Sequence, residues 1–147
     1  MAVFFDEKTR IFYLEGKNVT YSFFVDDSRY LEHLYFGARI ARDDIRYTAF
    51  EGRGSFEAIS SQKCTYNLKN PEISFFGLGD YKEPTVQVQN PEGDRISELL
   101  FDGYEILSEK PKINGMPSMD GGETLVVHLK DSVTDFAADL YYTVYDD

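Results

Sequence analysis

Short runs of aromatic and β-branched residues recur along most of this chain, and clusters of glycine, proline, asparagine and aspartate separate them. Such residues fit a pleated, half-buried surface, and no segment of ten residues has the 3.6-residue period of a helix. The spacing predicts an all-β fold, an antiparallel β-sandwich of about ten short strands. The expected strands are residues 3–5, 11–14, 19–25, 31–36, 46–50, 64–68, 85–89, 104–107, 124–129 and 136–145.

Composition limits the chain to one domain and excludes several classes of partner. Its 147 residues are enough for one core, and no linker or internal repeat divides them. The formal net charge of −11 argues against nucleic acid, which requires clustered Lys and Arg, and against an anionic membrane surface. Residues 57–62 are expected to form at most a single helical turn.

The chain shows no sign of secretion. Cys64 is the single cysteine, so an intrachain disulfide framework is excluded and a reducing compartment is favoured. Residues 1–25 lack the basic start and apolar run of a signal peptide, and no stretch approaches the ~18 apolar residues of a membrane span. We therefore expect a cytoplasmic protein.

Five motifs occur in a fixed order, and together they resemble the amino-terminal β-domain of family 36 glycoside hydrolases, the α-galactosidases and their relatives. They are YLEHLYFG (30–37), FGLGDYKEP (76–84), EKPKINGMP (109–117), ETLVVHLKD (123–131) and LYYTVY (140–145). The resemblance implies that residues 1–147 are an amino-terminal β-sandwich domain, shorter than the intact one and part of a β-supersandwich. In that family the domain supports a (β/α)8 barrel, and this chain contains no barrel.

Catalytic residues are not expected in this chain. Glycoside hydrolysis needs two carboxyl groups facing each other across the scissile bond. The family carries its nucleophile in a Lys-x-Asp barrel strand, and no such strand occurs here. The acidic pairs Asp26–Asp27, Asp43–Asp44 and Asp146–Asp147 are expected to be solvated turn residues. We expect this chain alone to be inactive, and the resemblance implies neither a cofactor nor a metal.

The remaining reactive side chains also favour structural roles. His33 and His128 have no Cys or carboxylate at ligand spacing, and His33 is expected to be packed and hydrogen-bonded. Cys64 has no basic neighbour and is expected to be a small buried hydrophobe. Gly77 is expected in a tight turn that needs positive φ. Where the family usually has arginine, this chain has Lys82, which cannot form a bidentate carboxylate clamp.

Residues 41–56 are the candidate site. In oligomeric members of the family, the corresponding loop approaches the active-site mouth of a neighbouring subunit and helps to define the sugar pocket. Arg53 lies between two glycines, with Glu51, Phe50 and Phe56 nearby, so hydrogen-bond donors and acceptors stand beside aromatic faces. This combination suits a sugar, but the segment departs from the family's patterns, and a solvated loop is the alternative.

The expected function follows from the resemblance. It is the non-catalytic amino-terminal domain of an intracellular α-galactosidase, a retaining enzyme acting on sugars such as melibiose or raffinose. Its expected partners are its own carboxy-terminal barrel, neighbouring subunits of a homo-oligomer and the carbohydrate substrate. The alternatives are a stand-alone β-sandwich that binds carbohydrate or another partner, and a purely structural oligomerisation domain.

Overall fold

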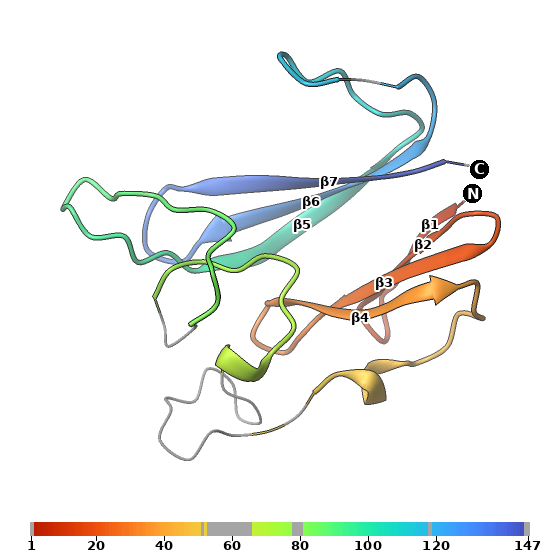
Figure 1. The fold of residues 1–147 in the computed structure, drawn as a ribbon, viewed down its shortest axis with the longest axis horizontal. Coiled ribbons are helices and arrows are strands. Elements are labelled where there is room, and N and C mark those ends of the chain that lie inside the picture. The colour runs from red at the N-terminus through yellow and green to blue at the C-terminus, as the bar shows by residue number, and fades with distance from the viewer. Residues whose placement is uncertain (1, 51, 53–65, 78–80, 118, 146–147) are drawn as a thin grey trace.

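Two antiparallel sheets packed face to face make up the protein (Figure 1). The computed structural model describes residues 2–50, 52, 66–77, 81–117 and 119–145. The first sheet has the order β1 (Ala2–Asp6), β2 (Ile11–Glu15), β3 (Val19–Val25) and β4 (Leu31–Ala38). The second has the order β5 (Leu99–Leu107), β6 (Glu123–Asp131) and β7 (Ala137–Val144). Two single-turn 3-10 helices, η1 (Arg46–Thr48) and η2 (Tyr66–Leu68), lie between β4 and β5.

Each sheet is a meander in which consecutive strands are neighbours, and the all-β sandwich is confirmed. The first turn shows why the chain reverses where it does. The carboxylate of Asp6 accepts hydrogen bonds from the Lys8 amide at 3.0 Å and the Thr9 hydroxyl at 2.7 Å. Arg10 then takes a positive φ of 59° before β2 begins. Turn residues that bond their own backbone thus fix the register of the first hairpin.

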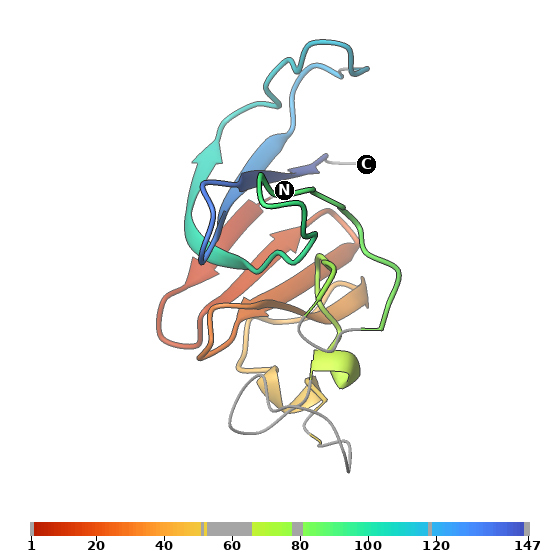
Figure 2. The same cartoon turned by 90° about the vertical axis from the view of Figure 1, so that its left-hand side faces the viewer.

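The two sheets form separate layers (Figure 2), and aromatic side chains fill the space between them. Phe12 lies at its centre and is fully buried. Its ring centroid is 4.3 Å from that of Phe5, 5.0 Å from Phe23 and 5.2 Å from Tyr104, which belongs to the opposite sheet. Offset and edge-to-face pairs of this kind stabilise a core beyond the apolar area that they bury. The high Phe and Tyr content therefore serves the interface between the two sheets.

Three expected strands are absent from the described residues. Residues 46–48 form η1, because the Asp44 carboxylate accepts the Arg46 amide at 3.2 Å and the Thr48 amide bonds the Ile45 carbonyl. Residues 66–68 form η2 in place of a strand. Residues 85–89 contribute only an isolated bridge, from Val86 to Phe75. Seven strands are therefore found in the described part of the chain, and the expected turn at residues 57–62 lies outside it.

The carboxy-terminal meander is longer than expected. β5 begins at Leu99, five residues before the predicted 104–107 strand, and a bulge at Phe101/Gly103 interrupts its pairing with β6. β6 and β7 coincide closely with the predicted strands at 124–129 and 136–145. Among the described residues, no helix has both the length and the apolar character that a membrane crossing requires.

Candidate functional site

The first half of the candidate segment packs on the outer face of the first sheet, away from the main core. Ile45 is buried there against Ile11, Tyr13 and Leu34, which form a second, smaller apolar cluster. The Tyr13 hydroxyl donates a hydrogen bond to the carbonyl of Asp43. Burial raises the pKa of this phenol. The segment between β4 and η1 is therefore attached to the sheet by both apolar packing and a backbone contact.

A buried carboxylate holds the start of the same segment. Glu15, at the end of β2, is 3% exposed and accepts two hydrogen bonds from the Arg42 guanidinium, at 3.1 and 2.6 Å. Arg39 lies 3.5 Å away as a second cation, and Arg42 also covers the ring of Phe4 at 4.4 Å. The bonds from Arg42 hold the pKa of Glu15 below its ordinary value, although burial opposes them. A bidentate fork of this kind fixes direction as well as distance.

Of the four predicted sugar contacts, the structure describes one, Phe50. Phe50 is 54% exposed, so its ring is available at the end of the anchored segment. Glu51, Arg53 and Phe56 lie outside the described residues, so the predicted arrangement of four side chains stays a prediction.

A second buried charge cluster fixes the chain where it returns to the sheet, just after η2. Lys69 is 3% exposed, and its ammonium group bonds the carboxylates of Asp26 and Glu32, the latter at 2.6 Å. Asp26 also accepts the amides of Ser28 and Tyr30, both at 2.8 Å. Asp26 is therefore a buried anchor, which corrects its predicted role as a solvated turn residue. Asp27 is fully exposed, as expected.

The pKa shifts of this cluster reflect its burial. Burial raises the pKa of Glu32, and the bond from Lys69 offsets only part of that effect. Burial alone would lower the pKa of Lys69, but its two carboxylate partners outweigh burial and raise it. The ammonium group is therefore charged at neutral pH, and one cation faces two acidic groups in a dry environment.

A third carboxylate joins the two sheets. Glu72 accepts hydrogen bonds from Tyr21 of β3 at 2.7 Å and from Tyr142 of β7 at 2.9 Å. His33 of β4 lies 3.3 Å from the same group, which confirms its predicted hydrogen-bonded role. Burial and the neighbouring Glu72 raise the pKa of both phenols, so they remain donors over the ordinary pH range.

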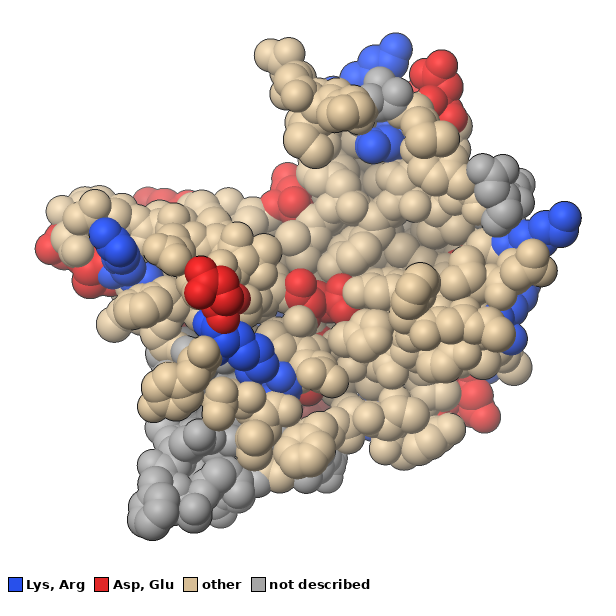
Figure 3. Space-filling view, viewed as in Figure 1, with Lys and Arg blue, Asp and Glu red and all other residues tan. Residues whose placement is uncertain are grey.

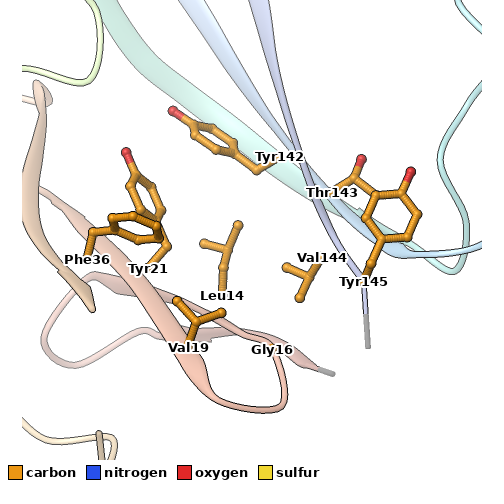
Figure 4. A pocket seen from close by; sticks show the side chains of 9 residues that line it. All are labelled: Leu14, Gly16, Val19, Tyr21, Phe36, Tyr142, Thr143, Val144 and Tyr145. Carbon is orange, nitrogen blue, oxygen red and sulfur yellow. The ribbon is translucent and has the colours of Figure 1, made fainter. Parts of the chain in front are cut away.

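A hollow of about 440 Å³ opens between the sheets next to Tyr21 and Tyr142 (Figure 4). Side chains from both sheets face one another across it, and none of its lining residues is charged. The face drawn in Figure 3 carries most of its Lys and Arg side chains at the margins, whereas Asp and Glu side chains also lie near its centre. The lining residues are Leu14, Gly16, Val19, Tyr21, Phe36, Tyr142, Thr143, Val144 and Tyr145.

The buried carboxylates and His128 have hydrogen-bond partners among the described residues. Glu15, Asp26, Glu32, Glu72 and Asp131 are each bonded to donors within the fold, and no group of three or more metal-ligand side chains occurs among the described residues. His128 is bonded to Asp139 at 2.8 Å.

The structure also describes Gly77 and Lys82, two further positions that the sequence singles out. Gly77 has a φ of +111°, as a tight turn requires. The Lys82 ammonium donates a hydrogen bond to the backbone carbonyl of Asn67 at 2.9 Å. Sequence reasoning missed Lys69 and Glu72. Residues 68–70 resemble an ordinary polar loop, and nothing in the neighbouring sequence indicates that the Lys69 side chain is buried.

Comparison with known proteins places these features in a family context. Residues 29–147 match the family described as the glycosyl hydrolase family 36 N-terminal domain. The chain is 30% identical over 152 residues to α-galactosidase Mel36A from Lactobacillus acidophilus, covering 97% of this chain and 21% of that protein. It is 31% identical over 151 residues to α-galactosidase 1 from Pediococcus pentosaceus, with coverage of 97% and 21%.

The fold is similar to that of solved structures. The crystal structure of the GH36 α-galactosidase AgaB from Geobacillus stearothermophilus superposes with a TM-score of 0.89 at 26% identity. The match covers 99% of this chain and 21% of that one. This chain thus spans about a fifth of the length of the curated relatives that it matches.

Proposed function

This chain belongs to the glycosyl hydrolase family 36 N-terminal domain family, and from that premise we propose that it is the non-catalytic amino-terminal part of a longer α-galactosidase. The observation that carries the proposal is the asymmetry of coverage. Matches extend over nearly the whole of this chain but only a fifth of each relative. The hydrolysis of α-galactosides such as melibiose or raffinose would then be performed by residues outside this chain, in a retaining enzyme.

The domain would act by support and positioning. Its sheets would brace the carboxy-terminal catalytic barrel, and its outer-face segment would contribute to a sugar pocket in a homo-oligomer. The anchoring of residues 39–50 supports this role, because Arg42 and Ile45 hold the segment that ends at the exposed ring of Phe50. Phe50, Glu51, Arg53 and Phe56 are the proposed contacts to the carbohydrate. The proposed compartment is the cytoplasm.

The first test is to read the gene past the codon for Asp147 and to express whatever polypeptide it encodes. We expect an open frame that leads into a (β/α)8 barrel with a Lys-x-Asp strand. The 147-residue chain should not hydrolyse p-nitrophenyl α-galactoside, and the longer polypeptide should. A stop codon after Asp147, together with sugar binding by the isolated chain, would replace the proposal with a stand-alone binding module.

The second test concerns the sugar contacts in the longer enzyme. Arg53→Ala and Phe50→Ala should raise KM for the galactoside and leave kcat nearly unchanged, because they remove ground-state binding and spare the reacting groups. Tyr47→Ala is the matched control, because Tyr47 is 82% exposed on the same segment and is not a proposed contact. Equal KM values for all three variants and the wild type would contradict the assignment.

A further inference from the structure

The segment that links β5 to β6 extends beyond the two sheets (Figure 1) and has an Asn-Gly pair at a turn. The Met116 amide bonds the carbonyl of Ile113 at 3.1 Å, so Asn114 and Gly115 are the two central residues of this turn. Gly115 has a φ of +81°, as the third residue of a type II turn requires. Residues 112–117 are all exposed, so solvent reaches both central residues.

The peptide group between Asn114 and Gly115 has open surroundings. No other residue in the described part of the chain forms a hydrogen bond with the Asn114 side chain or with the Gly115 amide. A Cβ added at Gly115 would meet no atom within 4 Å. Nothing described here therefore keeps the Gly115 nitrogen away from the side-chain amide of Asn114.

The residue that follows an asparagine decides how easily this thermolabile side chain reacts. The main-chain nitrogen of that residue can attack the side-chain amide carbon of the asparagine and close a succinimide ring. A side chain on the attacking residue crowds the ring, and glycine has none. A proline nitrogen carries no proton to lose, so it cannot attack in this way.

The other asparagines of the chain lack this combination of features. Of the five asparagines in the sequence, Asn114 alone precedes a glycine, and Asn70 and Asn90 precede prolines. Asn67 lies within η2 and precedes a leucine. Asn18 is exposed like Asn114, but it precedes the β-branched valine that begins β3. Asn18 is therefore the matched internal comparison for Asn114.

We propose that Asn114 is a site of spontaneous deamidation in the folded protein. The Gly115 nitrogen gives its proton to hydroxide and bonds to the side-chain carbonyl carbon of Asn114. The bond from that carbon to the side-chain nitrogen breaks, and the leaving group takes a proton from water and departs as ammonia, which restores the hydroxide. One water then opens the succinimide ring. Opening at the side-chain carbonyl gives aspartate, and opening at the main-chain carbonyl gives isoaspartate.

Both products change the properties of this turn. Each adds a carboxylate, which makes the net charge one unit more negative than −11. Isoaspartate also places an extra carbon in the main chain between Ile113 and Met116, where a single hydrogen bond closes the turn. A type II turn has exactly two residues between the bonded groups, so the longer main chain does not fit it. The modification therefore alters both the charge and the shape of this segment.

Peptide mapping by mass spectrometry tests the proposal in the 147-residue protein. The folded protein is incubated in mildly alkaline buffer, and the peptides that contain asparagine are followed over time. The Asn114 peptide should give two separable products, each with the mass increase of an exchange of NH2 for OH. Its reaction should be at least about tenfold faster than that of Asn18. Aspartates before Gly103 and Gly121 can lose and regain only water, so they cause no such mass change.

Two comparisons relate the reaction to the folded structure. The rate at Asn114 in the folded protein should lie within about tenfold of the rate in urea, because exposed loop tips open at little cost in free energy. Hydroxylamine, which attacks the succinimide ring, should cut the folded protein into fragments 1–114 and 115–147. Both measurements report on the ring itself and need no substitution.

A pair of variants isolates the residue. Asn114→Gln should abolish the products and the hydroxylamine cut, because glutamine would have to close a larger ring. Asn18→Gln should leave both unchanged, and both positions are exposed, so neither variant should disturb the fold. The proposal is overturned if the Asn114 peptide reacts in urea but not in the folded protein. Equal reaction at Asn18, or products that persist in Asn114→Gln, would also overturn it.

Discussion

Replacing Lys69 by methionine should destabilise the protein by about 3–5 kcal/mol at pH 7, the usual result of removing one partner of a buried ion pair. Lys69 is 3% exposed, so water cannot take its place beside Asp26 and Glu32. A domain of this size has a total stability of roughly 5–15 kcal/mol, so the loss is a large fraction of it. Lys17→Met is the control, because Lys17 is exposed in a turn, and its effect should stay within about 0.5 kcal/mol.

The loss should also depend on pH, and its sign follows from Glu32. Burial raises the pKa of Glu32 in the folded protein above its ordinary value of 4.5. A carboxyl group with a raised folded pKa contributes stability that is fully present below the unfolded pKa and is lost as pH rises through the folded pKa. Removing Lys69 takes away the bond that restrains this shift. The penalty of Lys69→Met should therefore be smallest near pH 4 and grow towards pH 7.

Urea unfolding at several pH values measures these effects. Far-ultraviolet circular dichroism and tyrosine fluorescence can follow the transition, since the chain has no tryptophan. Combining Lys69→Met with Asp26→Asn and Glu32→Gln should recover most of the loss, because no uncompensated charge stays buried. A loss below about 1 kcal/mol, or the same loss at pH 4 and pH 7, would show that the cluster does not stabilise the fold in this way.

Three further predictions concern other parts of the fold. Arg42→Ala should cost about 1–2 kcal/mol in urea unfolding at neutral pH, a value kept low because Arg42 is 38% exposed. Since the folded pKa of Glu15 is lowered, this contribution is present above pH 4.5 and should disappear as pH falls through the folded pKa. Phe23→Ala should cost about 3–5 kcal/mol by the same assay, because Phe23 is fully buried in the core. Gly122→Ala should lower the unfolding temperature more than Gly121→Ala. Both glycines have positive φ, but an added Cβ at Gly122 would lie 2.6 Å from another side chain, whereas Gly121 faces open space.

The sequence predicts the fold correctly where turn residues encode a reversal of the chain and the strands on both sides of the turn pair with each other. The turn after β1 is encoded by Asp6, whose side chain bonds the next residues, and the flanking strands pair with each other. Residues 85–89 alternate between polar and apolar side chains, as a strand does, but among the described residues they form only the bridge from Val86 to Phe75. Alternation shows that a segment can form a strand, but a strand also needs a neighbour, and the sequence does not indicate one.

The candidate site was less predictable for a related reason. The sequence indicates that residues 41–56 combine aromatic and charged side chains, and the exposed ring of Phe50 agrees with that picture. It does not indicate which residues hold the segment. Lys69 is anchored by Asp26 and Glu32, which lie 43 and 37 residues earlier in the chain. Burial of a lysine in a polar stretch is decided by such distant partners, so no local pattern could reveal it.

The buried ion pairs of Arg42 and Lys69 connect the first sheet to the irregular segments between β4 and β5, and this distribution has a physical reason. The core between the sheets is apolar and aromatic, because strands already fix their own register through backbone pairing. The segments between β4 and β5 have no such pairing. There Arg42 bonds Glu15, and Lys69 bonds Asp26 and Glu32. Apolar packing could stabilise these segments equally well, but it would allow them to slide, whereas a charged hydrogen bond accepts one geometry. We infer that these ion pairs fix the position of the segments relative to the first sheet.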